Sequence, residues 1–196
     1  MYDSYKIARD MSWEVLLKCG INRLPVDLGL IANCYRYKII LFSKTNITQI
    51  LKKDVLSGDG FIIYNNNEKQ IFINDKINNR ARRRFTLAHE LGHGVLNHDI
   101  EQIHYRNNEI DNSDDLQELQ ANVFARDLLM PATVLAALNV HTADEIMKLC
   151  SVSKVSAEIR ADRLKELYKR NMFNKHPLER KVRAMFEEYI INYFNK

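Results

Sequence analysis

One short stretch decides how the rest of the chain is interpreted: Arg84-Phe85-Thr86-Leu87-Ala88-His89-Glu90-Leu91-Gly92-His93. Its residues are mostly apolar and no proline follows until Pro131, so the stretch is predicted to be a largely buried helix. Residues four apart share one face of a helix, and His89 and His93 can therefore present ring nitrogens to one metal ion. Two histidines and a glutamate buried without a partner would be costly. The pattern predicts a zinc site, with Glu90 as the base that takes a proton from water.

The sequence offers several residues as a third ligand. Asp99 stands where some sites of this kind place their last ligand, but the glycine that such a turn needs is missing. His98 and His104 are close in sequence, although a histidine at a helix end is more often a solvated cap than a ligand. Further along, Glu118 and Asn122 share one face of a predicted helix. Glu118 is the favoured carboxylate ligand of a His/His/Glu site, and Asn122 is the expected hydrogen-bond partner of a ligating histidine.

The segments before the motif predict two helices followed by strands. Apolar spacing predicts a helix from about Ser4 to Cys19, and Pro25 is expected to open a second one. Two short apolar runs flank an Asn-rich turn and predict a hairpin. The expected fold is α+β: mostly helical and zincin-like, with a small antiparallel sheet and an active-site His-Glu-x-x-His helix. An edge strand that pairs with an extended substrate is expected at Ile71, Phe72 and Ile73.

The C-terminal part is predicted to be helical, and the polar segment from Asp99 to Asp115 to be a loop. A capping box at Thr142 suggests a boundary, which divides the chain into a metallopeptidase domain, 1–140, and a helical region, 141–196. Residues 143–167 have the outline of a helix-turn-helix, whose Arg160 and Arg163 would meet phosphates if it bound DNA. A packed helical pair is the favoured interpretation. The last apolar periodicity, 178–194, predicts one terminal helix.

Composition agrees with a globular domain of ordinary character. The chain has 196 residues, 46% of them hydrophobic and 28% charged, with a formal net charge of +4. The charges of both signs are interspersed, which does not favour nucleic-acid binding. The three cysteines are too few and too far apart for a disulfide framework, and they indicate a reducing compartment. No signal segment or long apolar run is found, and we therefore expect a cytoplasmic protein.

Several motifs together resemble the ImmA/IrrE family of metallopeptidases. They are the run 84–93, the pattern Glu118-x-x-Ala121-Asn122-x-Phe124-Ala125, and Leu128-Leu129-Met130-Pro131. The resemblance covers roughly residues 22–165 and implies zinc bound by His89, His93 and Glu118, with Glu90 as base. It also implies cleavage of a helix-turn-helix repressor of a mobile element or stress regulon. Many members carry an acidic residue where this chain has Gln120.

Three functions follow as expectations. The first is a hydrolase: a zinc-dependent endopeptidase that acts as an anti-repressor by cutting a repressor protein. The second is a DNA-binding regulator that uses the element at 143–167 and has a structural or inactive zinc site. The third is a phage or toxin–antitoxin interaction module that binds a protein partner without cutting it. The first is favoured because a base stands between two potential metal ligands.

Overall fold

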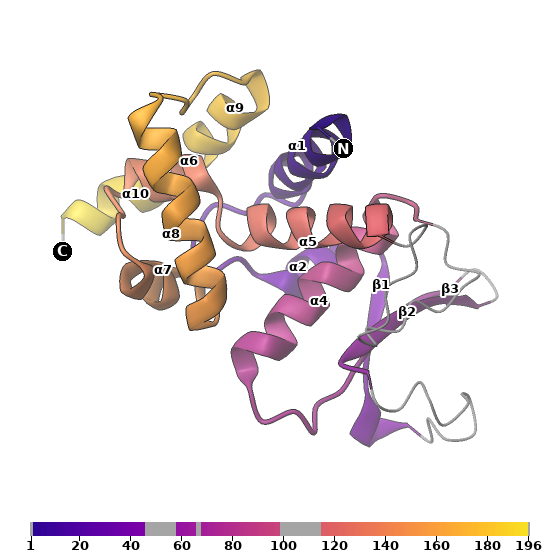
Figure 1. Ribbon diagram of the computed structural model, residues 1–196. Coiled ribbons are helices and arrows are strands. Elements are labelled where there is room, and N and C mark those ends of the chain that lie inside the picture. The colour runs from indigo at the N-terminus through magenta and orange to yellow at the C-terminus, as the bar shows by residue number, and fades with distance from the viewer. Residues whose placement is uncertain (1, 46–57, 66–67, 99–114, 196) are drawn as a thin grey trace. The chain divides into compact units, whose positions relative to one another are not determined.

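The computed structural model describes residues 2–45, 58–65, 68–98 and 115–195 and combines a small sheet with many helices (Figure 1). The expected α+β class is confirmed. The elements, in chain order, are α1 Tyr2–Lys18, α2 Leu28–Cys34, β1 Tyr37–Leu41, the 3-10 helix η1 Phe42–Lys44, β2 Gly60–Asn65, β3 Glu68–Ile73, α4 Arg80–Val95, α5 Asp115–Leu129, α6 Ala132–Ala137, α7 Ala143–Cys150, α8 Lys154–Lys169, α9 Pro177–Met185 and α10 Glu187–Phe194.

The chain divides into two compact units. One is formed by Met1–Ala8 and Leu28–Ala125, and the other by Arg9–Asp27 and Arg126–Lys196, so that two of the three boundaries fall within α1 and α5 and the third lies just before α2. The first unit holds the sheet, α4 and the start of α5. The sequence predicted a division into 1–140 and 141–196. That division concerns which segments fold and act independently, and it stays a prediction.

Near the N-terminus the expected helices are found, with one shifted boundary. The first helix ends at Lys18, and Gly20 follows it with a φ of 64°, a conformation that glycine adopts at little cost. The second helix begins at Leu28 rather than at Pro25, and its buried residues include Ile31. The predicted loop from Asp99 to Asp115 lies almost wholly outside the described residues.

The sheet is mixed rather than purely antiparallel, which corrects one expectation. Strands β2 and β3 form the predicted antiparallel hairpin, with Phe61 opposite Phe72. Strand β1 pairs with β3 in parallel, with Ile39 opposite Ile71, and the strand order is β1-β3-β2. Parallel strands need a long connection between them, and the whole of β2 together with the segment that precedes it separates β1 from β3 along the chain.

The expected role of Ile71, Phe72 and Ile73 as an edge strand is wrong. They lie in the central strand, paired on both sides, and their backbone groups cannot accept another strand. All three are at most 4% exposed. Phe72 stacks on Phe61 at 4.8 Å between ring centroids, within a cluster that includes Phe42. These residues therefore build the core of the sheet, and of the described strands only β1 and β2 have a free edge.

The helix α4 is anchored where it begins. The Asn79 side chain caps it by accepting a hydrogen bond from the backbone N–H of Arg82 at 2.9 Å. The Arg82 guanidinium makes two hydrogen bonds to the Asp59 carboxylate, which lies just before β2, and Arg83 donates to the Asp75 carbonyl. The basic run at 80–84 thus includes a salt-bridged arginine.

Gly94 makes close packing of α4 on the sheet possible. A methyl group at Gly94 would lie 2.2 Å from Oη of Tyr37, a side chain that is only 4% exposed. We expect Gly94→Ala to lower the free energy of unfolding by about 1–3 kcal/mol, although alanine normally favours a helix. Chemical denaturation would measure this, with the exposed Gly29→Ala in α2 as control. A variant as stable as the wild type would contradict the contact.

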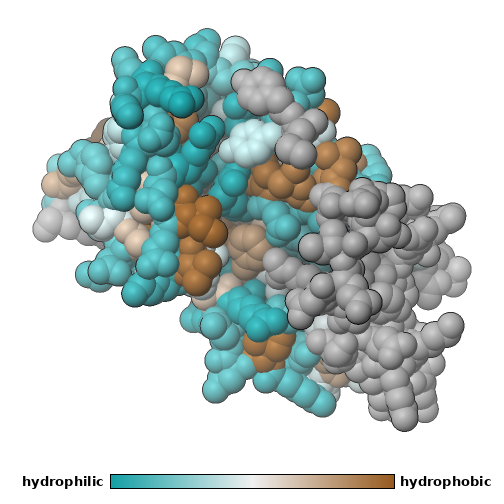
Figure 2. Space-filling model, in the orientation of Figure 1, coloured by the Kyte–Doolittle hydropathy of each residue, from teal (hydrophilic) through white to brown (hydrophobic). Residues whose placement is uncertain are grey.

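The second unit contains the helix-turn-helix outline expected at 143–167. Helix α7 begins with the predicted capping box between Thr142 and Glu145, and a left-handed Ser151 leads into α8. Arg160 in α8 is 1% exposed and does not face solvent, so it is not placed to meet phosphates as the less favoured DNA-binding alternative required. On the face shown in Figure 2 an apolar patch lies over α8 among hydrophilic residues. Val155 and Ile159 of this helix are 65% and 56% exposed.

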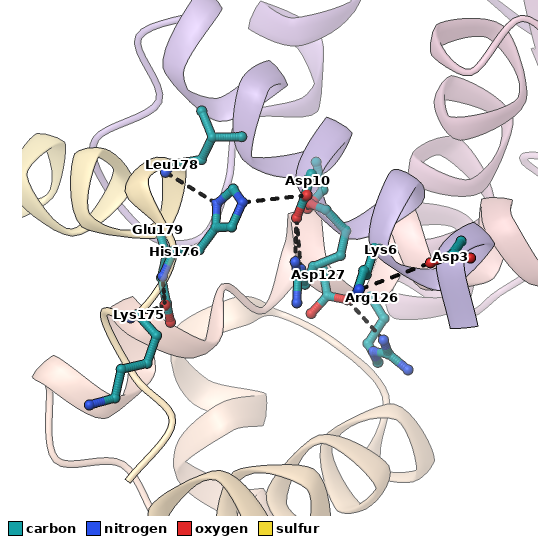
Figure 3. A network of polar contacts seen from close by, with 11 residues as sticks. Asp3, Lys6, Asp10, Arg126, Asp127, Lys175, His176, Leu178 and Glu179 are labelled. Atoms are coloured by element: carbon teal, nitrogen blue, oxygen red, sulfur yellow. Dashed lines mark hydrogen bonds and ion pairs between the residues drawn. The ribbon is translucent and has the colours of Figure 1, made fainter. Parts of the chain in front are cut away.

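A buried ion pair explains the position of Arg160. One guanidinium nitrogen lies 2.8 Å from the Asp127 carboxylate and another donates to the Met130 carbonyl. Asp127 also accepts from Arg126 at 2.8 Å, and Figure 3 shows these two residues together. Burial raises the pKa of the Asp127 carboxyl, but the Arg160 and Arg126 guanidinium groups outweigh burial and hold its pKa below the usual range. The pair fastens α8 onto the end of α5.

The C-terminal periodicity forms two helices rather than one. Helix α9 ends at Met185 and α10 begins at Glu187, with Phe186 between them at a φ of −89° and a ψ of 5°. His176 caps α9 and its other ring nitrogen lies 3.7 Å from the Asp10 carboxylate (Figure 3). None of the helices in the described parts of the chain has the length and apolar character that a membrane span requires.

Candidate metal centre

The helix that carries the histidines is buried along its second half. His89, Glu90 and His93 are at most 6% exposed. Gly92 faces α5, where an added methyl group would meet the Phe124 ring at 2.9 Å and the Ala121 Cα at 3.3 Å. A small residue is therefore needed for α4 and α5 to lie side by side as Figure 1 shows. This close approach brings side chains from two distant parts of the sequence together.

Three potential ligand atoms converge between α4 and α5. The Nε2 atoms of His89 and His93 lie 3.0 Å apart, and the Glu118 carboxylate lies 3.3 Å from the first and 3.1 Å from the second. One ligand atom from each residue falls within 4.8 Å of the others. Glu118 is 31% exposed at its side chain, whereas the histidines are buried. The cluster is thus reached by solvent on the carboxylate side.

A hydrogen bond orients the His89 ring. Its Nδ1 lies 3.1 Å from Oδ1 of Asn122, which stands one turn after Glu118 in α5. An amide oxygen only accepts hydrogen bonds, so Nδ1 carries the proton and the neutral ring keeps a lone pair on Nε2. The sequence predicted Asn122 as the hydrogen-bond partner of a ligating histidine; its contact with His89 is present, and its role beside a metal ligand stays a prediction. Helical spacing was the signal that identified it.

The donor set fits a zinc ion. Two imidazole nitrogens and a carboxylate oxygen are a known catalytic zinc combination that leaves one coordination position open. Lone pairs from three atoms about 3 Å apart would repel one another unless a proton or a cation lies between them. Burial raises the pKa of the Glu118 carboxyl, but in the metal-free cluster hydrogen bonds from protonated Nε2 atoms of His89 and His93 outweigh burial and hold that pKa well below the usual range; a zinc ion would replace those protons. The carboxylate is therefore charged and can attract a cation.

The remaining candidates from the sequence have different outcomes. Asp99 and His104 lie outside the described residues. His98 is not a solvated cap, because it is 8% exposed and its Nδ1 lies 3.0 Å from Nδ1 of His93. Its Nε2 lies 3.1 Å from Oε1 of Gln120. Sequence analysis missed this role for His98 and Gln120 because the contacts depend on the turn after α4 and on the packing of α5.

Comparison with known protein families supports the interpretation of the site. A family model of peptidase M78, described as IrrE N-terminal-like domain, matches residues 44–165, which is more than half of the chain. The chain belongs to this peptidase family. The resemblance to ImmA/IrrE metallopeptidases is therefore confirmed. The match includes α4 and α5 and so covers both helices that supply the cluster. Comparison with curated proteins found no significant match.

Proposed function

We propose that the chain is a zinc-dependent endopeptidase, with His89, His93 and Glu118 as the zinc ligands and Glu90 as the catalytic base. One observation carries the proposal: two imidazole Nε2 atoms and a carboxylate oxygen lie within 4.8 Å of one another, and the buried Glu90 follows the first of these histidines in sequence. Membership of a metallopeptidase family supports the same activity. A bound zinc ion would polarise the scissile carbonyl and lower the pKa of a bound water.

The chain's own residues account for the proton transfers of hydrolysis. Glu90 follows the first ligand in sequence and is not one of the three clustered residues, so its carboxylate can accept a proton. Water attacks the peptide carbonyl while Glu90 takes its proton. Glu90 then gives that proton to the leaving nitrogen as the C–N bond breaks. His89 and His93 keep their positions throughout, since their Nδ1 atoms are hydrogen-bonded to Asn122 and His98.

We further propose that the substrate is a helix-turn-helix repressor in the cytoplasm, which would make the chain an anti-repressor of a mobile element or stress regulon. The family resemblance supports this choice. Leu116 and Leu119 flank Glu118 in α5 and are 46% and 36% exposed, so a peptide at the carboxylate side would find apolar contacts. If a substrate strand pairs with the described part of the sheet, it would use the free edge of β1 or β2.

A regulatory role without cleavage is the second candidate. The element α7–α8 has a helix-turn-helix outline, but its Arg160 is buried in an ion pair and the first part of α8 exposes Val155 and Ile159. Exposed aliphatic side chains favour contact with protein over contact with phosphates. This observation supports a protein-docking role for α8 in either function.

Zinc binding tests the proposed ligands. We expect about one zinc per wild-type chain. Loss of an outer hydrogen-bond partner weakens metal affinity by at most about 100-fold. Glu118→Ala removes a proposed ligand and should therefore weaken zinc affinity by more than about 100-fold. Elemental analysis after dialysis, and titration against a chelator, would measure both. Glu158→Ala removes an exposed glutamate of α8 and serves as control. A wild type that retains no zinc would contradict the proposal.

A further inference from the structure

The chain turns back sharply after α4 and brings His98 over the last turn of the helix. Leu96 is the C-cap, Asn97 has a φ of 53°, and the backbone N–H of His98 donates to the His93 carbonyl at 3.0 Å. This is the six-to-one hydrogen bond of a Schellman motif, in which asparagine takes the left-handed position that glycine usually occupies. The turn therefore ties the backbone of His98 to the same residue that its side chain contacts.

With both imidazole rings neutral, the side-chain contacts form a chain of hydrogen bonds that runs in one direction. Oε1 of Gln120 only accepts, so Nε2 of His98 carries a proton and donates to it across 3.1 Å. The neutral His98 ring then has a lone pair on Nδ1. Nδ1 of His93, 3.0 Å away, must be the donor in that bond. His93 is left with its lone pair on Nε2, the atom that faces His89 and Glu118.

The amide of Gln120 is oriented for this task. Its Nε2 faces the Ser4 carbonyl of α1 at 3.5 Å, within the same compact unit, and a carbonyl takes only donors. The amide oxygen is consequently turned toward His98. Gln120 is uncharged, so it orients the histidines without adding a negative charge beside the site.

We propose that His98 and Gln120 are positioning residues that hold His93 in its Nε2-ligating tautomer through a neutral His93–His98–Gln120 relay. The inference rests on the proposed zinc site. It gives the two histidine ligands equivalent support: α5 orients His89 directly through Asn122, and it orients His93 indirectly through His98. Outer hydrogen-bond partners of this kind typically contribute about 10- to 100-fold to metal affinity.

Substitutions at position 98 separate the hydrogen bond from simple packing. The side-chain oxygen of asparagine is separated from the backbone by the same number of bonds as Nδ1 of histidine, and it can accept a hydrogen bond in its place. The terminal group of glutamine corresponds instead to Nε2 of histidine. Leucine fills similar space with no polar atom. We expect His98→Leu and His98→Gln to bind zinc about 10- to 100-fold more weakly than wild type, and His98→Asn to recover most of the affinity. Gln120→Met should show a smaller loss, because His98 still accepts from His93.

The measurements are zinc affinity by chelator competition and the ¹⁵N shifts of the histidine rings in the zinc-loaded wild type. The spectra should show His93 protonated at Nδ1; protonation at Nε2 would overturn the relay. Equal affinity of wild type and His98→Leu would also overturn it, as would an Asn variant as weak as the Leu variant. Thermal unfolding of each metal-free variant shows whether a loss of zinc affinity is caused by misfolding. The ¹⁵N spectrum of the wild type tests the relay without any variant.

The same series distinguishes failure of the relay from failure of the proposed function. If wild-type protein binds zinc and Glu118→Ala weakens it while His98→Leu does not, only the relay is overturned. If wild-type protein does not bind zinc, the proposed metal site and the relay are overturned together.

Discussion

Glu90→Gln should retain zinc at the wild-type level and cleave its protein substrate about 100- to 10,000-fold more slowly, the range that general acid–base catalysis typically contributes. The amide is close in size to the carboxylate but cannot accept the proton of water at neutral pH. Glu90 lies outside the cluster of three ligand residues, and its replacement therefore leaves the donor set intact.

The measurement compares zinc content and the rate of appearance of fragments from a helix-turn-helix repressor. Glu118→Ala should lose both zinc and cleavage, and Glu158→Gln, which changes an exposed residue of α8, should lose neither. A Glu90→Gln variant that cuts at the wild-type rate would exclude Glu90 as the base. A wild type that binds zinc and the repressor but never cuts it would instead favour the regulatory role.

Asp127→Asn should lower the free energy of unfolding by about 3–5 kcal/mol, because it leaves Arg160 buried without its counter-charge. The Arg160 side chain is 2% exposed and that of Asp127 5%. The matched control is Asp162→Asn, which removes a carboxylate of α8 that is 75% exposed and paired with Lys165. That change should alter stability by less than about 1 kcal/mol. Urea denaturation measures both.

The loss in Asp127→Asn should also depend on pH in a defined direction. The folded-state pKa of Asp127 lies below its unfolded value, so its contribution is present above the unfolded pKa and disappears as the pH falls through the folded one. Wild-type protein should therefore lose more stability than Asp127→Asn below about pH 4. Arg160→Met combined with Asp127→Leu should be more stable than either single variant, since it removes both members of the buried Arg160–Asp127 pair together. Additive losses would contradict a coupled pair.

Local patterns predicted much of the fold. The apolar neighbours of His89 predicted a buried helix, and Thr142 with Glu145 predicted the start of α7, because a capping box is formed by residues three apart. The hairpin of β2 and β3 was also predictable, since a short Asn-rich turn joins two short apolar runs. The position of β1 was not, because parallel pairing joins strands separated by a long connection and has no local signal.

The sequence by itself determined the fold class, the family and the candidate metal-binding face of α4, which follows from helical geometry because His89, Glu90 and His93 lie within one helix. The pattern at residues 118–125, near the start of α5, also identified Glu118 and Asn122 as candidate site residues. Only the tertiary structure decided which distant atoms meet. It placed Ile71–Ile73 at the centre of the sheet, buried Arg160 against Asp127, and brought His98 and Gln120 to His93. These contacts depend on how helices and strands pack, and no spacing along the chain encodes that.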